Sequence, residues 1–178
     1  MKITLAFLLL LIPFISKSQA SLDSALNRFK YNESNKVFFE KILVTQNSKN
    51  EMFKNAQKWI AINYRDYKSV TKIADEVQGV IIYKGISGIK DEISVQKFEY
   101  TVELTFKDNK ARLRLYDIGN LYYAGPGTNT PIEETLAIQK NRNDNDRDQA
   151  APNINQQYHL FNDLLVDISK AIVRKDDF

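Results

Sequence analysis

The sequence predicts an α+β domain in which helices pack on one face of a single antiparallel sheet of about five strands, in the order β-α-β-β-β-β-α. Three observations lead to this fold class. Residues 95–106 alternate between apolar and polar side chains, as a strand does when one sheet face is buried and the other is wet. Residues 48–64 and 154–172 instead repeat apolar side chains every three or four positions, which is the spacing of amphipathic helices. A chain of 178 residues, 43% of them hydrophobic, can bury one core of this kind.

Residues 1–20 are expected to be removed from the working protein. A positive start at Lys2 precedes an apolar run over 5–15, and Ser18 and Ala20 supply the small residues that precede a cleavage site. This order is typical of a secretory signal peptide. A membrane anchor would need ~20 apolar residues, which is more than this run contains. We therefore expect a protein exported to the periplasm or the exterior, without a transmembrane segment after cleavage.

Cleavage also changes the charge of the protein. Residues 1–20 contain two lysines and no acid, so the formal charge falls from +3 to +1 when they are lost. The chain has no cysteine, which excludes disulfides, thiolate metal sites and a lipid anchor on an N-terminal Cys. The exported product should be nearly neutral and not lipid-anchored.

The mature chain is expected to begin with a polar stretch, residues 21–35, that forms a partly ordered lead-in. High β propensity over 36–44 predicts the first strand. The pattern Ser48-x-x-Glu51 then predicts a capping box, in which the hydroxyl and the carboxylate satisfy backbone N–H groups at the start of a helix. The helix should run to about residue 64.

Two hairpins are expected next. Gly79 tolerates positive φ, and the β-rich runs on both sides of it predict a hairpin over 69–86. Residues 95–106 and 111–116 predict a second hairpin around the turn 108–109. The alternation of its side chains sets the register, with these residues opposite one another: Leu104 and Leu113, Val102 and Leu115, Glu103 and Arg114.

The remainder of the single domain, which spans 36–178, is predicted to be a long loop and a terminal helix. Residues 124–153 begin with Ala-Gly-Pro-Gly and contain no large apolar side chain over 139–149, so we expect a solvated loop. A helix start is expected near 130–133 within it. After Pro152, one apolar stripe predicts the helix: Ile154, Tyr158, Phe161, Leu165, Ile168 and Ile172.

Two segments resemble a known family. They are the run KNAQKWIAINYRDYKSVTKIADEVQGVIIYKG and the run FEYTVELTFKDNKARLRLYDI. With their Trp-containing helix, their Asp and Gly hairpin and the Lys-Asp-Asn-Lys hairpin over 107–110, they are similar to an exported bacterial family of unknown function with a TATA-binding-protein-like fold. The resemblance covers 36–123 and the terminal helix. It implies this fold and a location in the cell envelope, and it supplies no activity or catalytic residues.

Candidate metal sites are few. A single His excludes sites with several histidines. Asp144, Asp146 and Asp148 alternate as at the start of a calcium loop, which uses close carboxylates as hard oxygen ligands. Gln149 and Asn155, however, stand where that loop needs its glycine and its bidentate Glu. A solvated charged segment is the favoured interpretation, and we predict no metal site.

Candidate catalytic residues are also better explained by structure. The run Gly-Ile-Ser-Gly over 85–88 is shorter than the G-x-S-x-G nucleophile elbow and favours a turn. His159 lies four residues before Asp163 on the terminal helix, which favours a surface pair. Glu133 and Glu134 suit the first turn of a helix. No catalytic residue or cofactor is predicted, and an enzyme is not expected.

Candidate binding residues lie on and beyond the last predicted strand. The sheet face away from the helices should present Arg112, Arg114 and Tyr116, and Tyr122 and Tyr123 come directly before a glycine-rich segment. Tyrosines beside such segments often form recognition surfaces. Acids on the same face interrupt the basic residues, so the basic patch that phosphate binding requires is not expected, and neither is a nucleic-acid partner.

The sequence therefore favours an exported, non-catalytic binding module of the bacterial envelope. Its partner would be an envelope protein, a glycan or a small ligand, bound at the open sheet face, the tyrosines or the loop over 124–153. The alternative is a carrier that holds a small apolar ligand between the sheet and the terminal helix, with that loop as a lid. The alternative requires a cavity between these two layers.

Overall fold

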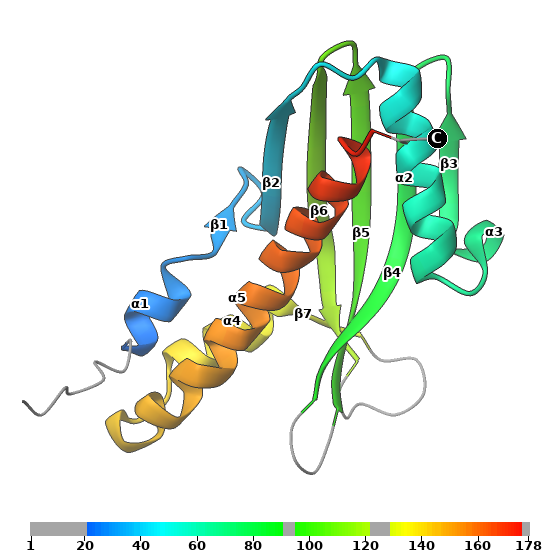
Figure 1. Ribbon diagram of the computed structural model, residues 1–178. Coiled ribbons are helices and arrows are strands. Elements are labelled where there is room, and N and C mark those ends of the chain that lie inside the picture. The colour runs from blue at the N-terminus through cyan, green and yellow to red at the C-terminus, as the bar shows by residue number, and fades with distance from the viewer. Residues whose placement is uncertain (1–20, 91–94, 122–128, 176–178) are drawn as a thin grey trace, which may run out of the picture.

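The computed structural model describes residues 21–90, 95–121 and 129–175 of the chain (Figure 1). They form the following helices and strands: α1 (Leu22–Leu26), β1 (Lys30–Tyr31), β2 (Val37–Val44), α2 (Lys49–Asn63), α3 (Tyr67–Val70), β3 (Thr71–Asp75), β4 (Val80–Lys90), β5 (Val95–Lys107), β6 (Lys110–Asn120), β7 (Thr130–Pro131), α4 (Ile132–Lys140) and α5 (Asp144–Ile172).

The strands form one antiparallel sheet in the order β1-β2-β6-β5-β4-β3, with β7 paired to β6. The predicted α+β class with helices on an antiparallel sheet is confirmed. Over the described residues the sheet has seven strands rather than about five. The additional strands are β1 and β7, which have two residues each and are too short to show an alternating pattern.

The predicted turns and register are found in the structure. Gly79 has φ +67° and Asn109 has φ +61°, so both hairpins turn through residues in the left-handed region. The pairs Leu104 with Leu113, Val102 with Leu115 and Glu103 with Arg114 lie directly opposite one another. The capping box is also present, since Ser48 and Glu51 exchange hydrogen bonds at the start of α2.

The core lies between the sheet and two helices that cross the same face of it, α2 and α5 (Figure 1). In α2 the buried residues are Met52, Phe53, Ala56 and Ile60. Trp59, the tryptophan of this helix, is half-buried and packs against the core. Every member of the predicted α5 stripe is buried except Tyr158, which is half-buried. The helical spacing therefore identified the side chains that face the sheet.

The N-terminal segment differs from the expectation of a partly ordered lead-in over 21–35. This segment forms α1 and β1, and its residues Leu22, Ala25 and Phe29 are buried in the core. The Phe29 ring packs edge-on against Phe39 and Tyr158, with ring centroids 5.9 and 5.7 Å apart. Three apolar residues in a short polar segment are enough to anchor it once a partner surface exists.

The segment 124–153 also differs from the predicted loop. Within its described residues it forms β7, α4 and the first part of α5, which runs through Pro152 without interruption. Ala150 and Ala151 are almost fully buried, and their packing outweighs the hydrogen bond that Pro152 removes from the helix. In α4, Ile132 and Leu136 are buried one turn apart. No helix in the described ranges is long and apolar enough to cross a membrane.

Candidate functional site

Three of the residues predicted to bind a partner lie together on the sheet face that points away from α2 and α5. Arg112, Arg114 and Tyr116 occupy alternate positions of β6, and the side chains between them, Leu113 and Leu115, are buried on the helix side. We call this surface the open sheet face. The register assigns to it, besides those three, Glu40 and Ile42 of β2, Glu99, Thr101, Glu103 and Thr105 of β5, Ile82, Lys84 and Ile86 of β4, and Ile73 of β3.

Both arginines form ion pairs with carboxylates of neighbouring strands. Arg112 Nη2 lies 3.1 Å from Glu103 Oε1, and Arg114 Nε lies 3.5 Å from Glu40 Oε2. Glu103 sits opposite Arg114, as predicted, but its side chain reaches diagonally to Arg112 instead. All four side chains are partly exposed, so each pair contributes only about 0–1 kcal/mol to stability. The pairs do, however, neutralise both arginines within the face.

Apolar side chains surround these ion pairs. Ile42 is 54% exposed and lies opposite Arg112, and Ile86 is 57% exposed and lies opposite Glu99. On β3, Ile73 is also exposed. When a partner covers a large aliphatic side chain that was exposed to water, the free energy of the system falls. The open sheet face therefore combines neutralised charges with exposed aliphatic groups.

The tyrosines expected at the end of this strand can be assessed only in part. Tyr116 is half-buried on the open sheet face, and burial raises the pKa of its hydroxyl, with a further contribution from the Glu103 carboxylate. The phenol thus stays neutral and can donate a hydrogen bond. Tyr122 and Tyr123 lie outside the residues that the structure describes.

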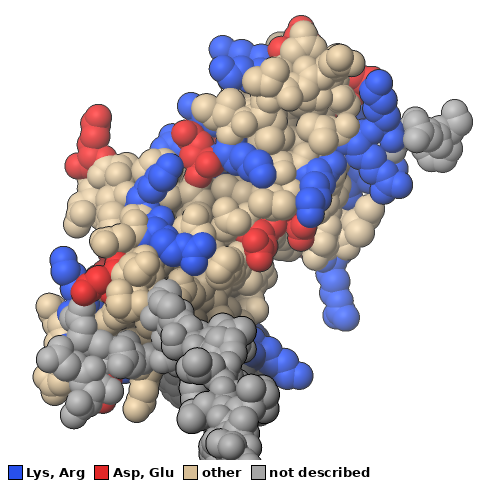
Figure 2. All heavy atoms as spheres, turned by 60° about the vertical axis from the view of Figure 1, so that its left-hand side comes forward, with Lys and Arg blue, Asp and Glu red and all other residues tan. Residues whose placement is uncertain are grey.

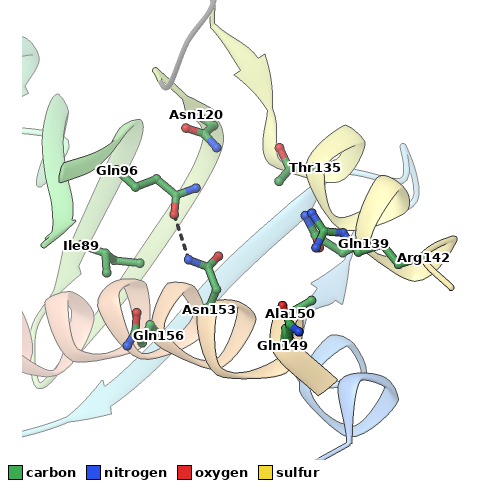
Figure 3. A pocket seen from close by; sticks show the side chains of 10 residues that line it. All are labelled: Ile89, Gln96, Asn120, Thr135, Gln139, Arg142, Gln149, Ala150, Asn153 and Gln156. Atoms are coloured by element: carbon green, nitrogen blue, oxygen red, sulfur yellow. Dashed lines mark hydrogen bonds between the residues drawn. The ribbon is translucent and has the colours of Figure 1, made fainter. Parts of the chain in front are cut away.

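A second candidate site, which the sequence did not suggest, is a pocket of about 450 Å³ at the end of the sheet where β4, β5 and β6 meet α4 and α5. Figure 3 shows it with the strand ends on one side, α4 on the other and α5 along its base. Its lining is dominated by amide side chains: Gln96, Asn120, Gln139, Gln149, Asn153 and Gln156. Thr135, Arg142, Ile89 and Ala150 complete it. We call it the amide pocket.

Hydrogen bonds order part of the amide pocket. Gln157, which is 1% exposed, donates from Nε2 to Asn153 Oδ1 at 2.6 Å, and Asn153 donates from Nδ2 to Gln96 Oε1 at 3.3 Å. The second of these bonds joins α5 to β5 across the pocket (Figure 3). The Gln157 Oε1 atom is buried without a hydrogen-bond partner in the described part of the chain. This row of amides is therefore anchored on a buried side chain and ends at Gln96.

The space between the sheet and α5 is filled by aromatic rings. Phe161, which is fully buried in the middle of α5, has ring centroids 5.5 Å from Phe39, 5.4 Å from Phe98 and 6.2 Å from Tyr100. A closed apolar cavity between these layers would separate such rings. The packing therefore weighs against the carrier alternative, which needs room for an apolar ligand there.

The hydroxyl of Ser87 is held in a structural network. Ser87 Oγ lies 2.7 Å from the Tyr100 hydroxyl, which lies 2.9 Å from the Tyr64 hydroxyl. Burial is the largest cause that raises the pKa of Tyr64 and of Tyr100, so both phenols are neutral. Gly85 makes room for this network, because a Cβ there would lie 2.6 Å from both the Tyr100 ring and the Tyr64 hydroxyl. Ser87 therefore has a phenol beside it, not a general base.

The other residues considered for chemistry also have structural contacts. His159 Nε2 lies 3.4 Å from Arg28 Nη1, rather than in the expected pair with Asp163. Glu133 accepts a 2.7 Å hydrogen bond from the Val37 backbone N–H. The side chains of Asp144 and Asp148 lie outside the described part of the chain. Among the side chains that are described, no group of three or more His, Asp or Glu could hold a metal ion.

The central part of the chain matches a family model. Residues 38–120, from β2 to the end of β6, match the domain of unknown function DUF4468, described as having a TBP-like fold. Over these residues the chain is similar to the DUF4468 family, and the TBP-like fold of that family is the fold seen here. The resemblance inferred from the Trp-containing helix and the two hairpins is thereby confirmed. None of the curated proteins compared matches the sequence.

Two solved bacterial structures are similar to this chain. One is a TBP-like protein from Parabacteroides distasonis, with a TM-score of 0.64 and 16% identity over 83% of this chain and 98% of that one. The other is a DUF4468 family protein from Bacteroides ovatus, with a TM-score of 0.62 and 16% identity over 84% of this chain and 93% of that one. At this identity the likeness establishes the fold.

Proposed function

We propose that this protein is an exported, non-catalytic binding module that contacts a protein of the bacterial envelope through its open sheet face. The observation that carries the proposal is the composition of this face, in which Arg112 and Arg114 are already paired with carboxylates and Ile73 and Ile86 are exposed. Burial of the aliphatic groups supplies free energy at about 25 cal/mol per Å² of apolar surface.

The internal ion pairs also favour a protein over a phosphate polymer as the partner. Binding to nucleic acid draws its free energy from cations that neutralise phosphates, and Arg112 and Arg114 are occupied by Glu103 and Glu40. On the side brought forward in Figure 2, which carries β1 and β2, Lys and Arg are interspersed with Asp and Glu on a mostly uncharged surface. A protein partner can cover such pairs without leaving an unpaired charge.

Export of the protein is supported by residues 1–20, whose charged start, apolar run and small residues match a signal peptide. Fractionation of the producing cell, followed by N-terminal sequencing, tests this part of the proposal. We expect the protein outside the cytoplasm with Ser21 as its first residue. Recovery of the full chain from the cytoplasm would contradict export.

The contact surface is tested with two matched substitutions. Ile86→Lys places a charge on the open sheet face, and Ile62→Lys places the same charge on the solvent side of α2, where Ile62 is 73% exposed. Both variants should fold, because both side chains are exposed in the wild type. Affinity capture from the envelope, followed by titration with the purified partner, should show roughly tenfold weaker binding for Ile86→Lys alone. Equal binding by both variants would refute the open sheet face as the contact surface.

A further inference from the structure

The amide pocket has the composition of a site for a neutral, polar molecule. An amide side chain offers both a donor and an acceptor, and a sugar hydroxyl group does the same. Six amides from β5, β6, α4 and α5 line a pocket of about 450 Å³. This volume falls within the range of about 300–1,000 Å³ that is common for ligand pockets.

The charge of the lining narrows the class of ligand. Among the described residues that line the pocket, Arg142 is the single charged one, it is exposed, and none of them carries a carboxylate. These residues offer no carboxylate to bind a cation, and they offer only one guanidinium to a molecule with several negative charges. Ile89 and Ala150 add apolar contacts to the polar ones. Such a mixture suits a saccharide ring, whose edge carries hydroxyl groups and whose faces carry C–H groups.

The row of hydrogen bonds orients the Gln96 amide in the pocket. Gln157 is buried and donates to Asn153, which in turn donates to Gln96 Oε1, so the oxygen of Gln96 is occupied. Figure 3 shows the Gln96 amide nitrogen pointing toward the side of the pocket formed by α4. Gln96 is thus held by its oxygen with its N–H groups directed at the space a ligand would fill.

The buried Gln157 side chain, where this row of amides begins, supports a binding role for the pocket. Gln157 Oε1 has no partner among the described residues, and an unsatisfied buried acceptor costs about 1–3 kcal/mol. A side chain that only filled the core would avoid this cost if it were apolar. Gln157 instead holds Asn153 at hydrogen-bonding distance from Gln96, which fixes two donors of the pocket before any ligand arrives.

We infer that the amide pocket binds a neutral saccharide, with Gln96 and Asn153 as donors to its hydroxyl groups. This site lies at the end of the sheet, and the inference does not depend on the partner of the open sheet face. A polar peptide offers similar hydrogen-bonding groups and is treated as an outcome of the test.

The test is isothermal titration calorimetry of the full mature protein, after a glycan array has selected the best neutral oligosaccharide. Trigalacturonic acid and a neutral alanine tripeptide serve as the charged probe and the peptide probe. We expect the neutral oligosaccharide alone to bind, and Gln96→Leu to weaken its affinity roughly tenfold through the lost hydrogen bonds. Asn162→Leu, which changes an amide of α5 that does not line the pocket, should leave the affinity unchanged.

Thermal denaturation of each variant identifies any that fails to fold, and Gln139→Leu on α4 then replaces Gln96→Leu. The inference is overturned if no neutral glycan of the array binds, if the tripeptide or the acidic trisaccharide binds in its place, or if Gln96→Leu and Gln139→Leu bind as tightly as the wild type.

Discussion

Removal of the Phe161 ring should destabilise the protein severely. Phe161 is fully buried, and its ring packs against three others, those of Phe39, Phe98 and Tyr100. Phe161→Ala loses the transfer free energy of the ring and leaves a cavity between α5 and the sheet, at a cost of about 3–5 kcal/mol. Single domains are stable by about 5–15 kcal/mol, so this change removes a large share of the stability.

Urea denaturation followed by circular dichroism measures this loss. For a domain of 150–250 residues, about 2–4 °C of melting temperature is lost per kcal/mol, so a drop of roughly 6–20 °C should accompany it. Ile138→Ala is the control, because Ile138 is 62% exposed on α4 and its loss should change stability by at most about 0.5 kcal/mol. A loss below about 1 kcal/mol for Phe161→Ala would contradict the filled core, since removal of a ring that already lines a cavity costs little stability.

Three further predictions concern local structure and titration. Gly79→Ala should cost at least about 1 kcal/mol in urea denaturation, because φ is +67° and the new Cβ would lie 2.5 Å from the Phe106 carbonyl oxygen; unchanged stability would refute this strain. The backbone and side-chain hydrogen bonds from Ser48 lower the pKa of Glu51, so its stabilisation is complete above the ordinary value of 4.5 and is lost as pH falls through the lowered pKa. Glu51→Gln should flatten the acid side of the stability curve, and an unaltered curve would count against the capping box. Burial raises the pKa of Tyr64 and Tyr100, so stability should be complete below the ordinary value of 10.0 and fall as pH rises above it. The protein has other tyrosines that ionise, so tyrosinate absorbance is compared between the wild type and Tyr64→Phe or Tyr100→Phe; loss of absorbance at the ordinary pH in either variant would contradict their burial.

Much of the fold could be predicted because the sheet has one wet face. The alternation over 95–106 determines which side chains are buried, and it correctly placed Leu104 opposite Leu113. The capping box at Ser48 depends on residues three positions apart, so it too could be inferred locally. In each case the pattern and the interaction that it encodes lie in the same short segment.

The start of α5 could not be predicted for the opposite reason. A proline and a polar run favour a loop by local propensity, and only the burial of Ala150 and Ala151 against distant elements explains the helix there. Similarly, α1 is held by contacts of its apolar side chains with α5, far away in sequence. Tertiary packing therefore determines the helical structure of both segments.

The candidate sites also divide into features that a local pattern predicts and features that depend on contacts between distant segments. The alternating pattern of the last predicted strand placed Arg112, Arg114 and Tyr116 on one face, although their partners depend on β2 as well as β5. The amide pocket was missed because Gln96, Gln139 and Asn153 come from three elements and each is unremarkable in sequence. The one local signal was the spacing of Gln149, Asn153 and Gln156, which places three amides on one side of a helix.

Crosslinking in intact cells tests the central claim, that the open sheet face contacts an envelope protein, most directly. A photoreactive amino acid is placed at position 86 on the open sheet face or at position 62 on α2, where both isoleucines are exposed. We predict one discrete protein adduct from position 86, reduced when Tyr116→Ala is added, and none from position 62. Equal adducts from both positions, or only a diffuse background from position 86, would contradict the claim.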